Sequence, residues 1–157
     1  MYLYRIGPEQ YLTNFSGLGA SYRDGARWNL PGLPVVYFAL SPSVAMLEMA
    51  NYLPSPRLVP KSYRLAKYEL KDIDYDQWHV KDLPAEWNSY PHTFSTQSLG
   101  SAWLKKNDKV ILILPSSAVP EGLECIALFN PNHPDAKKLV LVDSLKEIYS
   151  ERMFSGV

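Results

Sequence analysis

Cysteine and net charge are both scarce in this sequence. Cys125 is the only cysteine among 157 residues, so the chain forms no internal disulfide, and a zinc site built on cysteine pairs is excluded. Sixteen Lys plus Arg balance sixteen Asp plus Glu, for a formal net charge of +0. This balance argues against a polyanionic partner, so we expect neither direct nucleic-acid binding nor binding to a membrane surface.

Long hydrophobic runs are absent as well. No apolar stretch approaches the ~20 residues of a membrane span, and the first residues do not have the pattern of a cleaved signal peptide. We therefore predict a cytoplasmic protein. A chain of 157 residues is near the usual size of one domain and can bury a core without disulfides or metals, so residues 1–157 are predicted to form a single domain.

Several common catalytic and cofactor motifs are missing. The glycines form neither a dinucleotide-binding Gly-x-Gly-x-x-Gly motif nor a P-loop with its lysine. His79, His92 and His133 lack metal-ligand spacing, so we predict no metal site. Ser116 and Ser117 follow an apolar strand but lie in no Gly-x-Ser-x-Gly turn, which disfavours a hydrolase nucleophile.

Two helices are predicted from capping residues and apolar spacing. Ser41-Pro42 combines an N-cap residue with proline at the first helical position, so a helix is predicted from 42 to about 52. Ser95 is predicted to cap a second helix that ends near Lys106, because the apolar residues between them recur at helical spacing.

Strands outnumber these helices and do not alternate with them. They are predicted at 2–6, 35–39, 62–70, 110–114, 125–129 and 139–142. The irregular segment 72–92 is assigned no regular structure. This arrangement predicts an α+β fold rather than a doubly wound parallel sheet.

Three charged residues lie where a functional partner is plausible. Arg27 belongs to the turn Gly25-Ala26-Arg27-Trp28-Asn29, and its planar guanidinium suits a pyrophosphate or a carboxylate. Arg5 lies within a predicted strand, and Glu48 shares a helix face with apolar residues. Each also has a structural alternative: a surface loop, the solvent face of a strand, and the edge of an apolar face. The residues alone leave both interpretations open.

Seven short motifs follow one another along the chain. They are Tyr4-Arg5, Gly25-Ala26-Arg27-Trp28-Asn29, Pro34-Val35-Val36-Tyr37, Ala45-Met46-Leu47-Glu48, Thr96-Gln97-Ser98-Leu99-Gly100, Leu114-Pro115-Ser116 and Asn130-Pro131-Asn132-His133-Pro134. Taken in this order, from Tyr4 to about Pro134, they resemble the RES-domain family, which is named for its arginine, glutamate and serine. One departure is Ile126, which takes the place of a common asparagine, with Glu124 two residues earlier.

The resemblance implies a bacterial type II toxin with an ADP-ribosyltransferase-like fold, in which a mixed β-sheet core carries few helices. It also implies an Xre-like helix-turn-helix antitoxin that neutralises the toxin. Family members degrade NAD⁺ by hydrolysis or phosphorolysis of the nicotinamide N-glycosidic bond, and some ADP-ribosylate a protein. NAD⁺ is then the substrate, and no cofactor is expected. Two assemblies fit the resemblance, a homodimer and a toxin–antitoxin heterocomplex.

Carried over motif by motif, the resemblance gives each candidate residue a role. Arg5 and Arg27 would hold the phosphates of NAD⁺, and Tyr37 would pack near the nicotinamide. Glu48 would be the catalytic carboxylate, and Ser116 would complete the site. The chemistry agrees with these residue types, because breaking the glycosidic bond develops an oxocarbenium-like ribose that a fixed carboxylate stabilises.

Other function classes are weighed against this one. In a non-catalytic binding module, Arg5, Arg27 and Glu48 would form a structural ion-pair cluster. A ribonuclease toxin is disfavoured by the neutral charge and by the absence of a basic strip with interleaved aromatic residues. The predicted enzyme is therefore an NAD⁺ glycohydrolase or phosphorylase, with an ADP-ribosyltransferase that modifies a protein as the alternative.

Overall fold

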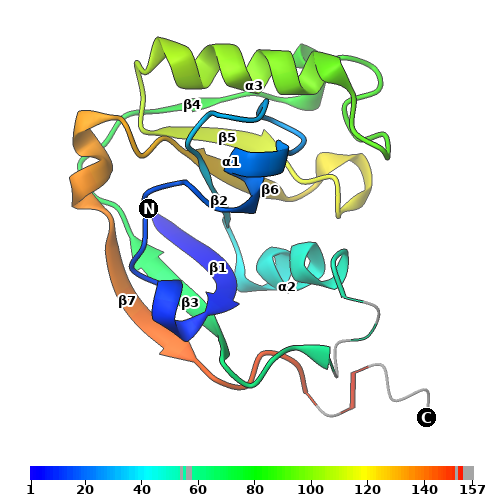
Figure 1. Cartoon of the computed structure of the whole chain (residues 1–157). Coiled ribbons are helices and arrows are strands. Elements are labelled where there is room, and N and C mark those ends of the chain that lie inside the picture. The colour runs from blue at the N-terminus through cyan, green and yellow to red at the C-terminus, as the bar shows by residue number, and fades with distance from the viewer. Residues whose placement is uncertain (54, 56–57, 151, 154–157) are drawn as a thin grey trace.

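A mixed β-sheet forms the frame of the protein, whose computed structural model describes residues 1–53, 55, 58–150 and 152–153 (Figure 1). Seven strands lie in the order β4-β5-β6-β2-β1-β3-β7. They are β1 (Tyr2–Pro8), β2 (Val36–Ala39), β3 (Tyr63–Glu69), β4 (Tyr75–Gln77), β5 (Ile111–Pro115), β6 (Cys125–Phe129) and β7 (Val140–Leu145). Neighbours pair antiparallel except β4 and β5, which are parallel.

β1 is an inner strand of the sheet, and its pairing with β3 is much longer than its pairing with β2. It pairs with β3 along the whole of Tyr2–Pro8, whereas with β2 it shares one residue pair, Tyr4 opposite Ala39. Figure 1 shows the two resulting halves, β1-β3-β7 below and β4-β5-β6-β2 above. The sheet changes direction at the boundary between β1 and β2.

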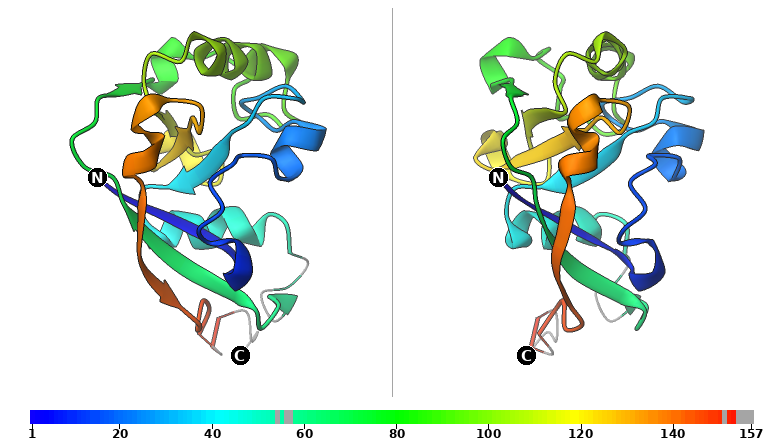
Figure 2. Two further views of the ribbon diagram at one scale, coloured as in Figure 1. Left: turned by 60° about the vertical axis from the view of Figure 1, so that its left-hand side comes forward. Right: turned by 90° about the vertical axis from the view of Figure 1, so that its left-hand side faces the viewer.

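Three α-helices in the described part of the chain accompany the sheet, which confirms the predicted α+β fold. They are α1 (Ala20–Asp24), α2 (Pro42–Ala50) and α3 (Phe94–Lys106), with short 3-10 turns η1 (Glu9–Tyr11), η3 (Val80–Asp82), η4 (Pro120–Gly122) and η5 (Pro134–Lys138). α3 covers the upper half of the sheet, and α2 lies beside β1 (Figure 1, Figure 2). None of the helices that the structure describes is long and apolar enough to cross a membrane.

Both predicted helices are present, and one of them is capped as expected. Ser41 is the N-cap of α2, and its hydroxyl accepts a hydrogen bond from the Val44 N–H at 3.2 Å. α3 has Thr93 rather than Ser95 in the N-cap position, so that predicted cap is wrong. The loop before α3 brings the Glu86 carboxylate close to Ser95. The Ser95 hydroxyl donates to Glu86 Oε1 at 2.7 Å and does not cap the helix.

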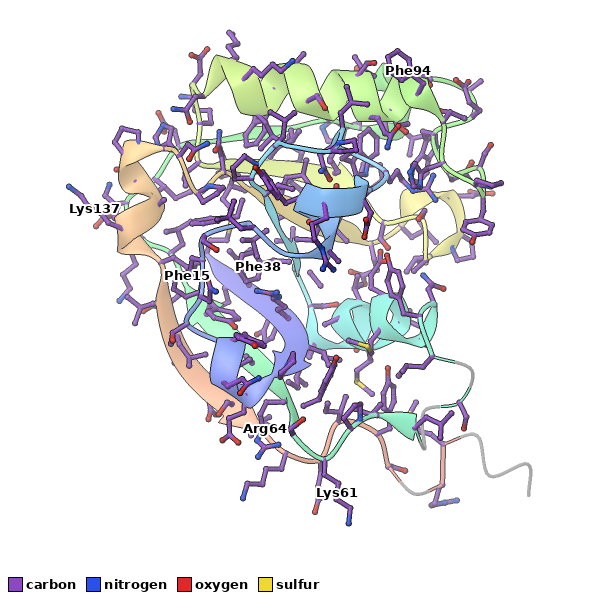
Figure 3. The ribbon with its side chains drawn as sticks, in the orientation of Figure 1. Phe15, Phe38, Lys61, Arg64, Phe94 and Lys137 are labelled. Atoms are coloured by element: carbon purple, nitrogen blue, oxygen red, sulfur yellow. The ribbon has the colours of Figure 1, made fainter. Side chains whose placement is uncertain are left out.

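Two apolar clusters lie on the two faces of the strands. The helix-side cluster packs against α2 and α3 and includes Trp28 and Trp103. The inter-half cluster includes Phe38 and Tyr68, whose rings meet edge to face with their centroids 5.1 Å apart. Phe38 is on β2 and Tyr68 is on β3, so this contact joins the two halves. Figure 3 shows Phe15 and Phe38 at the boundary.

The sequence does not predict the shortest elements. Segment 72–92, which was expected to be irregular, contains β4 and η3. β4 has 3 residues, none of them buried, and α1 has 5 residues, none of them buried. Elements that bury no apolar face leave no periodic hydrophobic signal.

Candidate functional site

The turn Gly25–Asn29 presents Arg27 from a rigid backbone. Ala26 and Asn29 are bridged by hydrogen bonds of 3.0 Å from the Ala26 N–H to the Asn29 carbonyl and 3.3 Å in the reverse direction. Gly25 has a φ of 75°, a conformation that favours glycine. Trp28 is fully buried and anchors the turn in the helix-side cluster. The position of Arg27 is therefore fixed by its neighbours in the sequence.

The loop before α3 clamps Arg27 from the other side. Arg27 Nη1 donates to the carbonyl groups of Trp87 and Ser89, each at 2.8 Å. Both bonds use one nitrogen, so the Nη2 and Nε edge of the guanidinium remains available for a planar anion. Burial lowers the pKa of Arg27 from its ordinary value, and Glu48 is the strongest of the groups that oppose this shift. Arg27 is a fixed, half-buried cation.

Tyr37 on β2 supports the same turn. Its hydroxyl donates to Asn29 Oδ1 at 2.7 Å and accepts from the Trp28 N–H at 3.2 Å. Asn29 is fully buried, and its amide donates to the carbonyl groups of Ser21 and Leu30. Burial raises the pKa of Tyr37 well above its ordinary value, so the hydroxyl stays protonated at neutral pH. Asn29 is a supporting residue to which the sequence assigned no role.

Glu48 and Ser116 meet although 68 positions separate them in the chain. The Ser116 hydroxyl donates to Glu48 Oε1 at 2.7 Å, and Ser116 Oγ accepts from the Ala118 N–H at 3.1 Å. Ser116 is fully buried directly after β5, and its N–H donates to the Glu124 carbonyl at 2.8 Å. The serine is thus oriented by the backbone on two sides and directs its proton to one carboxylate oxygen of Glu48, a half-buried residue of α2.

Arg27, Tyr37 and Glu48 form one electrostatic group. Arg27 and Glu48 both act on the pKa of the Tyr37 hydroxyl, and Glu48 acts on the pKa of Arg27. Ser116 joins the group through its hydrogen bond to Glu48. The elements involved meet at the right of Figure 1, where α2, the loop around η4 and the loop before α3 converge. The structure therefore brings four predicted site residues together.

Arg5 lies on a different face of the sheet. Strand alternation puts Arg5 on the side of β1 that carries Leu3, whereas Tyr4 and Ile6 pack in the helix-side cluster. Burial lowers the pKa of Arg5, and Tyr68 opposes that shift. None of the ion pairs among the described residues includes Arg5. Arg5 therefore faces the region between the two halves of the sheet and not the group around Glu48.

His92 and Gln97 border Arg27 and were given no role from the sequence. Gln97 Nε2 donates to the Asn29 carbonyl at 3.4 Å and lies 3.3 Å from His92 Nε2. Because an amide nitrogen only donates, this arrangement assigns the acceptor role to His92 Nε2 and the ring proton to Nδ1. Burial and the charge of Arg27 lower the pKa of His92, so the ring is neutral at pH 7. His92 is therefore a neutral side chain of the loop that holds Arg27.

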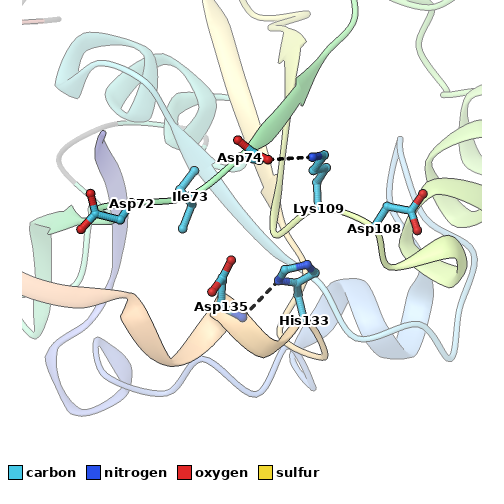
Figure 4. Close-up of a pocket in the computed structure, with 7 residues that line it drawn as sticks. All are labelled: Asp72, Ile73, Asp74, Asp108, Lys109, His133 and Asp135. Carbon is cyan, nitrogen blue, oxygen red and sulfur yellow. Dashed lines mark hydrogen bonds and ion pairs between the residues drawn. The ribbon is translucent and has the colours of Figure 1, made fainter.

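A hollow of about 430 Å³ lies away from these residues (Figure 4). It is lined by Asp72, Ile73, Asp74, Asp108, Lys109, His133 and Asp135. Lys109 pairs with Asp74 at 3.0 Å, and Lys138 pairs with Asp135 at 2.9 Å, so nearby lysines balance these carboxylates. Within the described ranges, no group of three or more His, Cys, Asp or Glu is arranged to hold a metal ion.

Comparison with known proteins supplies a family for this arrangement. The model of the RES domain matches residues 2–149. A protein named Toxin Res from Yersinia enterocolitica is 34% identical over 134 residues, which cover 85% of this chain and 86% of the relative. A protein named Prs ADP-ribosylating toxin from a Sphingobium species is 36% identical over 143 residues, which cover 89% of this chain and 86% of the relative.

A solved structure shares the fold. It is the crystal structure of the M. tuberculosis MbcT-MbcA toxin-antitoxin complex, which matches with a TM-score of 0.70 and 18% sequence identity. The match covers 92% of this chain and 82% of that chain. At this level of identity the similarity describes the arrangement of strands and helices.

Proposed function

Because the chain belongs to the RES domain family, we propose that it is the toxin of a toxin–antitoxin pair and that it cleaves NAD⁺ between nicotinamide and ribose. The observation that carries this proposal is the Glu48 carboxylate, oriented by the buried Ser116 hydroxyl at 2.7 Å. Burial lowers the pKa of the fixed cation Arg27, and Glu48 is the strongest of the groups that oppose this shift. The reaction needs a negative charge beside the ribose, where positive charge develops, and a positive charge beside the phosphates. Glu48 would supply the first and Arg27 the second.

The reaction breaks the bond between ribose C1′ and the nicotinamide nitrogen. The bonding electron pair leaves with nicotinamide, which becomes neutral, and positive charge develops on the ribose carbon and ring oxygen. A carboxylate beside that carbon lowers the free energy of the transition state more than that of the ground state. The acceptor, which is water, phosphate or a protein side chain, then supplies its lone pair to C1′ and loses a proton.

Ser116 acts as a positioning residue in this proposal. Its proton is directed to Glu48 Oε1, its side chain is fully buried, and the second carboxylate oxygen is left for the ribose. A carboxylate held in one orientation does not have to reorganise during the reaction, and this saves activation free energy. The serine therefore contributes by fixing the angle of the carboxylate.

Arg27 is assigned to the phosphates and Tyr37 to the nicotinamide side of the proposed site. The free edge of the Arg27 guanidinium matches two oxygens of a pyrophosphate, and the Trp87 and Ser89 carbonyls hold that edge in place. Arg5 stays only a prediction as a phosphate ligand, because it lies on the side of β1 that carries Leu3, away from the group around Glu48. An Arg5→Gln variant tests it: a raised KM for NAD⁺ supports a contact, and an unchanged KM contradicts one.

The direct test is to incubate the purified protein with NAD⁺ and to measure nicotinamide release, with and without phosphate. The wild type is expected to release nicotinamide, and Glu48→Gln is expected to lower kcat by about 100-fold or more. Glu147→Gln is the matched control, because Glu147 is an exposed carboxylate outside the group of Arg27, Tyr37, Glu48 and Ser116. Intact NAD⁺ after incubation with the wild type under both conditions would contradict the proposal. If Glu48→Gln still turns over NAD⁺ at the wild-type rate, the proposed catalytic role of the carboxylate is contradicted.

A second candidate reaction is transfer of ADP-ribose to a protein. It is favoured by the relative named Prs ADP-ribosylating toxin, which is 36% identical to this chain. The test is to incubate the protein with labelled NAD⁺ and purified Prs. Label on Prs that depends on Glu48 supports transfer, whereas nicotinamide release without labelled Prs supports hydrolysis or phosphorolysis.

We assign an Xre-like helix-turn-helix antitoxin as the partner. The shared fold with a chain of the MbcT-MbcA toxin-antitoxin complex supports a partner of antitoxin type. Co-expression with the product of the neighbouring reading frame should restore growth to cells that express this chain. A neighbour that neither binds the chain nor restores growth would contradict this assignment.

A further inference from the structure

One continuous segment of the chain, residues 87–101, holds Arg27 at both of its ends. The carbonyl groups of Trp87 and Ser89 accept hydrogen bonds from Arg27 Nη1 at 2.8 Å each. The chain then continues into α3, which is hydrogen-bonded to the backbone of the turn Gly25–Asn29 and of the residue after it. The guanidinium and the backbone around this arginine are therefore held by the same loop and helix.

Three residues of α3 face this turn. Gln97, Gly100 and Ser101 are spaced i, i+3 and i+4, so they lie on one side of the helix. Gln97 Nε2 donates to the Asn29 carbonyl at 3.4 Å, and Ser101 Oγ accepts from the Leu30 N–H at 2.9 Å. A side chain on Gly100 would collide with the backbone of the turn. This face of α3 thus contacts the turn through one donor, one acceptor and a backbone without a side chain.

The two side-chain hydrogen bonds differ in strength. Ser101 is 2% exposed, and its bond to the Leu30 N–H is short. Water has little access to replace this acceptor, and a buried N–H that loses its acceptor is costly in free energy. Gln97 is half-buried and its bond is long. Loss of the Ser101 hydroxyl should therefore disturb the turn more than loss of the Gln97 amide.

The loop that bears the two carbonyl groups is tied to the start of α3. The Ser95 hydroxyl, in the first turn of the helix, donates to Glu86 Oε1 at 2.7 Å. Glu86 directly precedes Trp87, which is itself buried in the helix-side cluster. The loop and the helix are therefore connected at both ends of segment 87–95, and they hold Arg27 as one unit.

We propose that segment 87–101 positions Arg27 for phosphate binding, with Gln97 and Ser101 as positioning residues. The inference rests on the proposed function, because it takes Arg27 as a ligand of the NAD⁺ phosphates. Two-point binding of a guanidinium to a pyrophosphate requires the planar group to be placed within about 0.5 Å. An arginine held at both ends also loses little side-chain freedom when the phosphate binds. The motif Thr96–Gly100, to which the resemblance gave no role, contributes to the site in this way.

The test uses Ser101→Ala and Gln97→Met, each of which removes one hydrogen bond to the turn. KM and kcat for nicotinamide release from NAD⁺ are measured. Ser101→Ala is expected to raise KM by about fivefold and Gln97→Met by about twofold, with kcat nearly unchanged, because the phosphates are held equally in the ground and transition states. Ser98→Ala is the matched control on α3, since the Ser98 hydroxyl makes no hydrogen bond among the described residues.

A double-mutant cycle separates positioning of Arg27 from a general effect on the fold. In the Arg27→Gln background the guanidinium is gone, so Ser101→Ala and Gln97→Met are expected to leave kcat/KM nearly unchanged. The midpoint of urea unfolding is measured for every variant.

Three results would decide against the positioning role. An equal fall of kcat/KM with and without Arg27 would overturn it, and so would an unchanged KM in both single variants, whether or not they lose stability. Either result, with an active wild type, leaves the proposed function intact. A wild type that releases no nicotinamide from NAD⁺ would overturn both.

Discussion

Gly100 of α3 lies directly against the backbone of Trp28. A Cβ placed on Gly100 would be 2.0 Å from the Trp28 carbonyl oxygen and 2.8 Å from its carbonyl carbon. The helix and the turn Gly25–Asn29 therefore approach each other as closely as two backbones can, and any side chain at position 100 separates them. The residue after Trp28 is Asn29, and the residue before it is Arg27, so this contact involves the same turn that presents Arg27.

Gly100→Ala is expected to destabilise the protein by about 1–3 kcal/mol, although alanine favours a helix more than glycine does. The reason is that backbone atoms of Trp28 cannot move away as a flexible side chain would. The midpoint of urea unfolding measures the loss. Gly7→Ala is the control, because a Cβ on Gly7 has no heavy atom within 4 Å. Equal stability of wild type and Gly100→Ala would show that the turn shifts without resistance.

Ser116→Ala is expected to lower kcat for NAD⁺ cleavage by about 10–100-fold with a smaller change in KM. The variant removes the proton that orients Glu48 Oε1 and leaves the Ala118 N–H without its acceptor. Steady-state kinetics give the two parameters separately. Ser117→Ala is the neighbouring control, because the Ser117 hydroxyl makes no hydrogen bond among the described residues. A change confined to KM would argue for a direct contact with substrate instead.

Arg27→Lys is expected to raise KM for NAD⁺ by about tenfold or more, even though the charge is kept. Lysine has one nitrogen, and it cannot bind two backbone carbonyls and present a planar edge to a pyrophosphate at the same time. Arg23→Lys on the exposed surface of α1 is the control. Kinetics of the two variants at low and high salt provide the measurement. Similar KM values for Arg27→Lys and the wild type would contradict a phosphate role.

Alkaline pH is expected to destabilise the fold through its buried tyrosines. Burial raises the pKa of Tyr68 from 10.0 to about 12, while Arg5 opposes the shift, and the Tyr68 hydroxyl donates to the Leu12 carbonyl at 2.9 Å. The folded state holds this proton more tightly than the unfolded state. The stabilisation is therefore complete below pH 10 and is lost as the pH rises toward 12.

The free energy of unfolding, measured by urea titration at pH 8 to 11, should fall more steeply for the wild type than for Tyr68→Phe. Tyr75→Phe is the control, because Tyr75 is half-exposed on β4 and should keep the wild-type pH dependence. Parallel curves for the wild type and Tyr68→Phe would contradict the role of Tyr68.

Local sequence signals predict the elements that bury an apolar face or contain a cap. α2 was predictable because Ser41 and Pro42 mark its start, and β6 was predicted with the bounds that the structure has. The order of the strands was not predictable, since pairing of β1 with β3 and of β2 with β6 depends on contacts between distant segments. β4 gave no signal because it is short and none of its residues is buried.

The candidate site also has a part that the sequence predicted and a part that it did not. The identities of Arg27, Glu48 and Ser116 came from motifs that resemble a family, but their partners could not come from motifs. Arg27 is held by backbone carbonyl groups, and every residue has a carbonyl, so no residue type marks them. The opposite orientation of Arg5 follows from strand alternation only after the neighbours of β1 are known.

The two halves of the sheet are hydrogen-bonded to each other at one residue pair, Tyr4 and Ala39. In mechanical terms this is the line of least bending stiffness in the sheet, because few ladder bonds resist rotation there. Arg5 lies on one side of that line, and Tyr37 lies on the other. A small change in the angle between the halves therefore alters the span from Arg5 to the group around Glu48, while the ladders within each half remain intact.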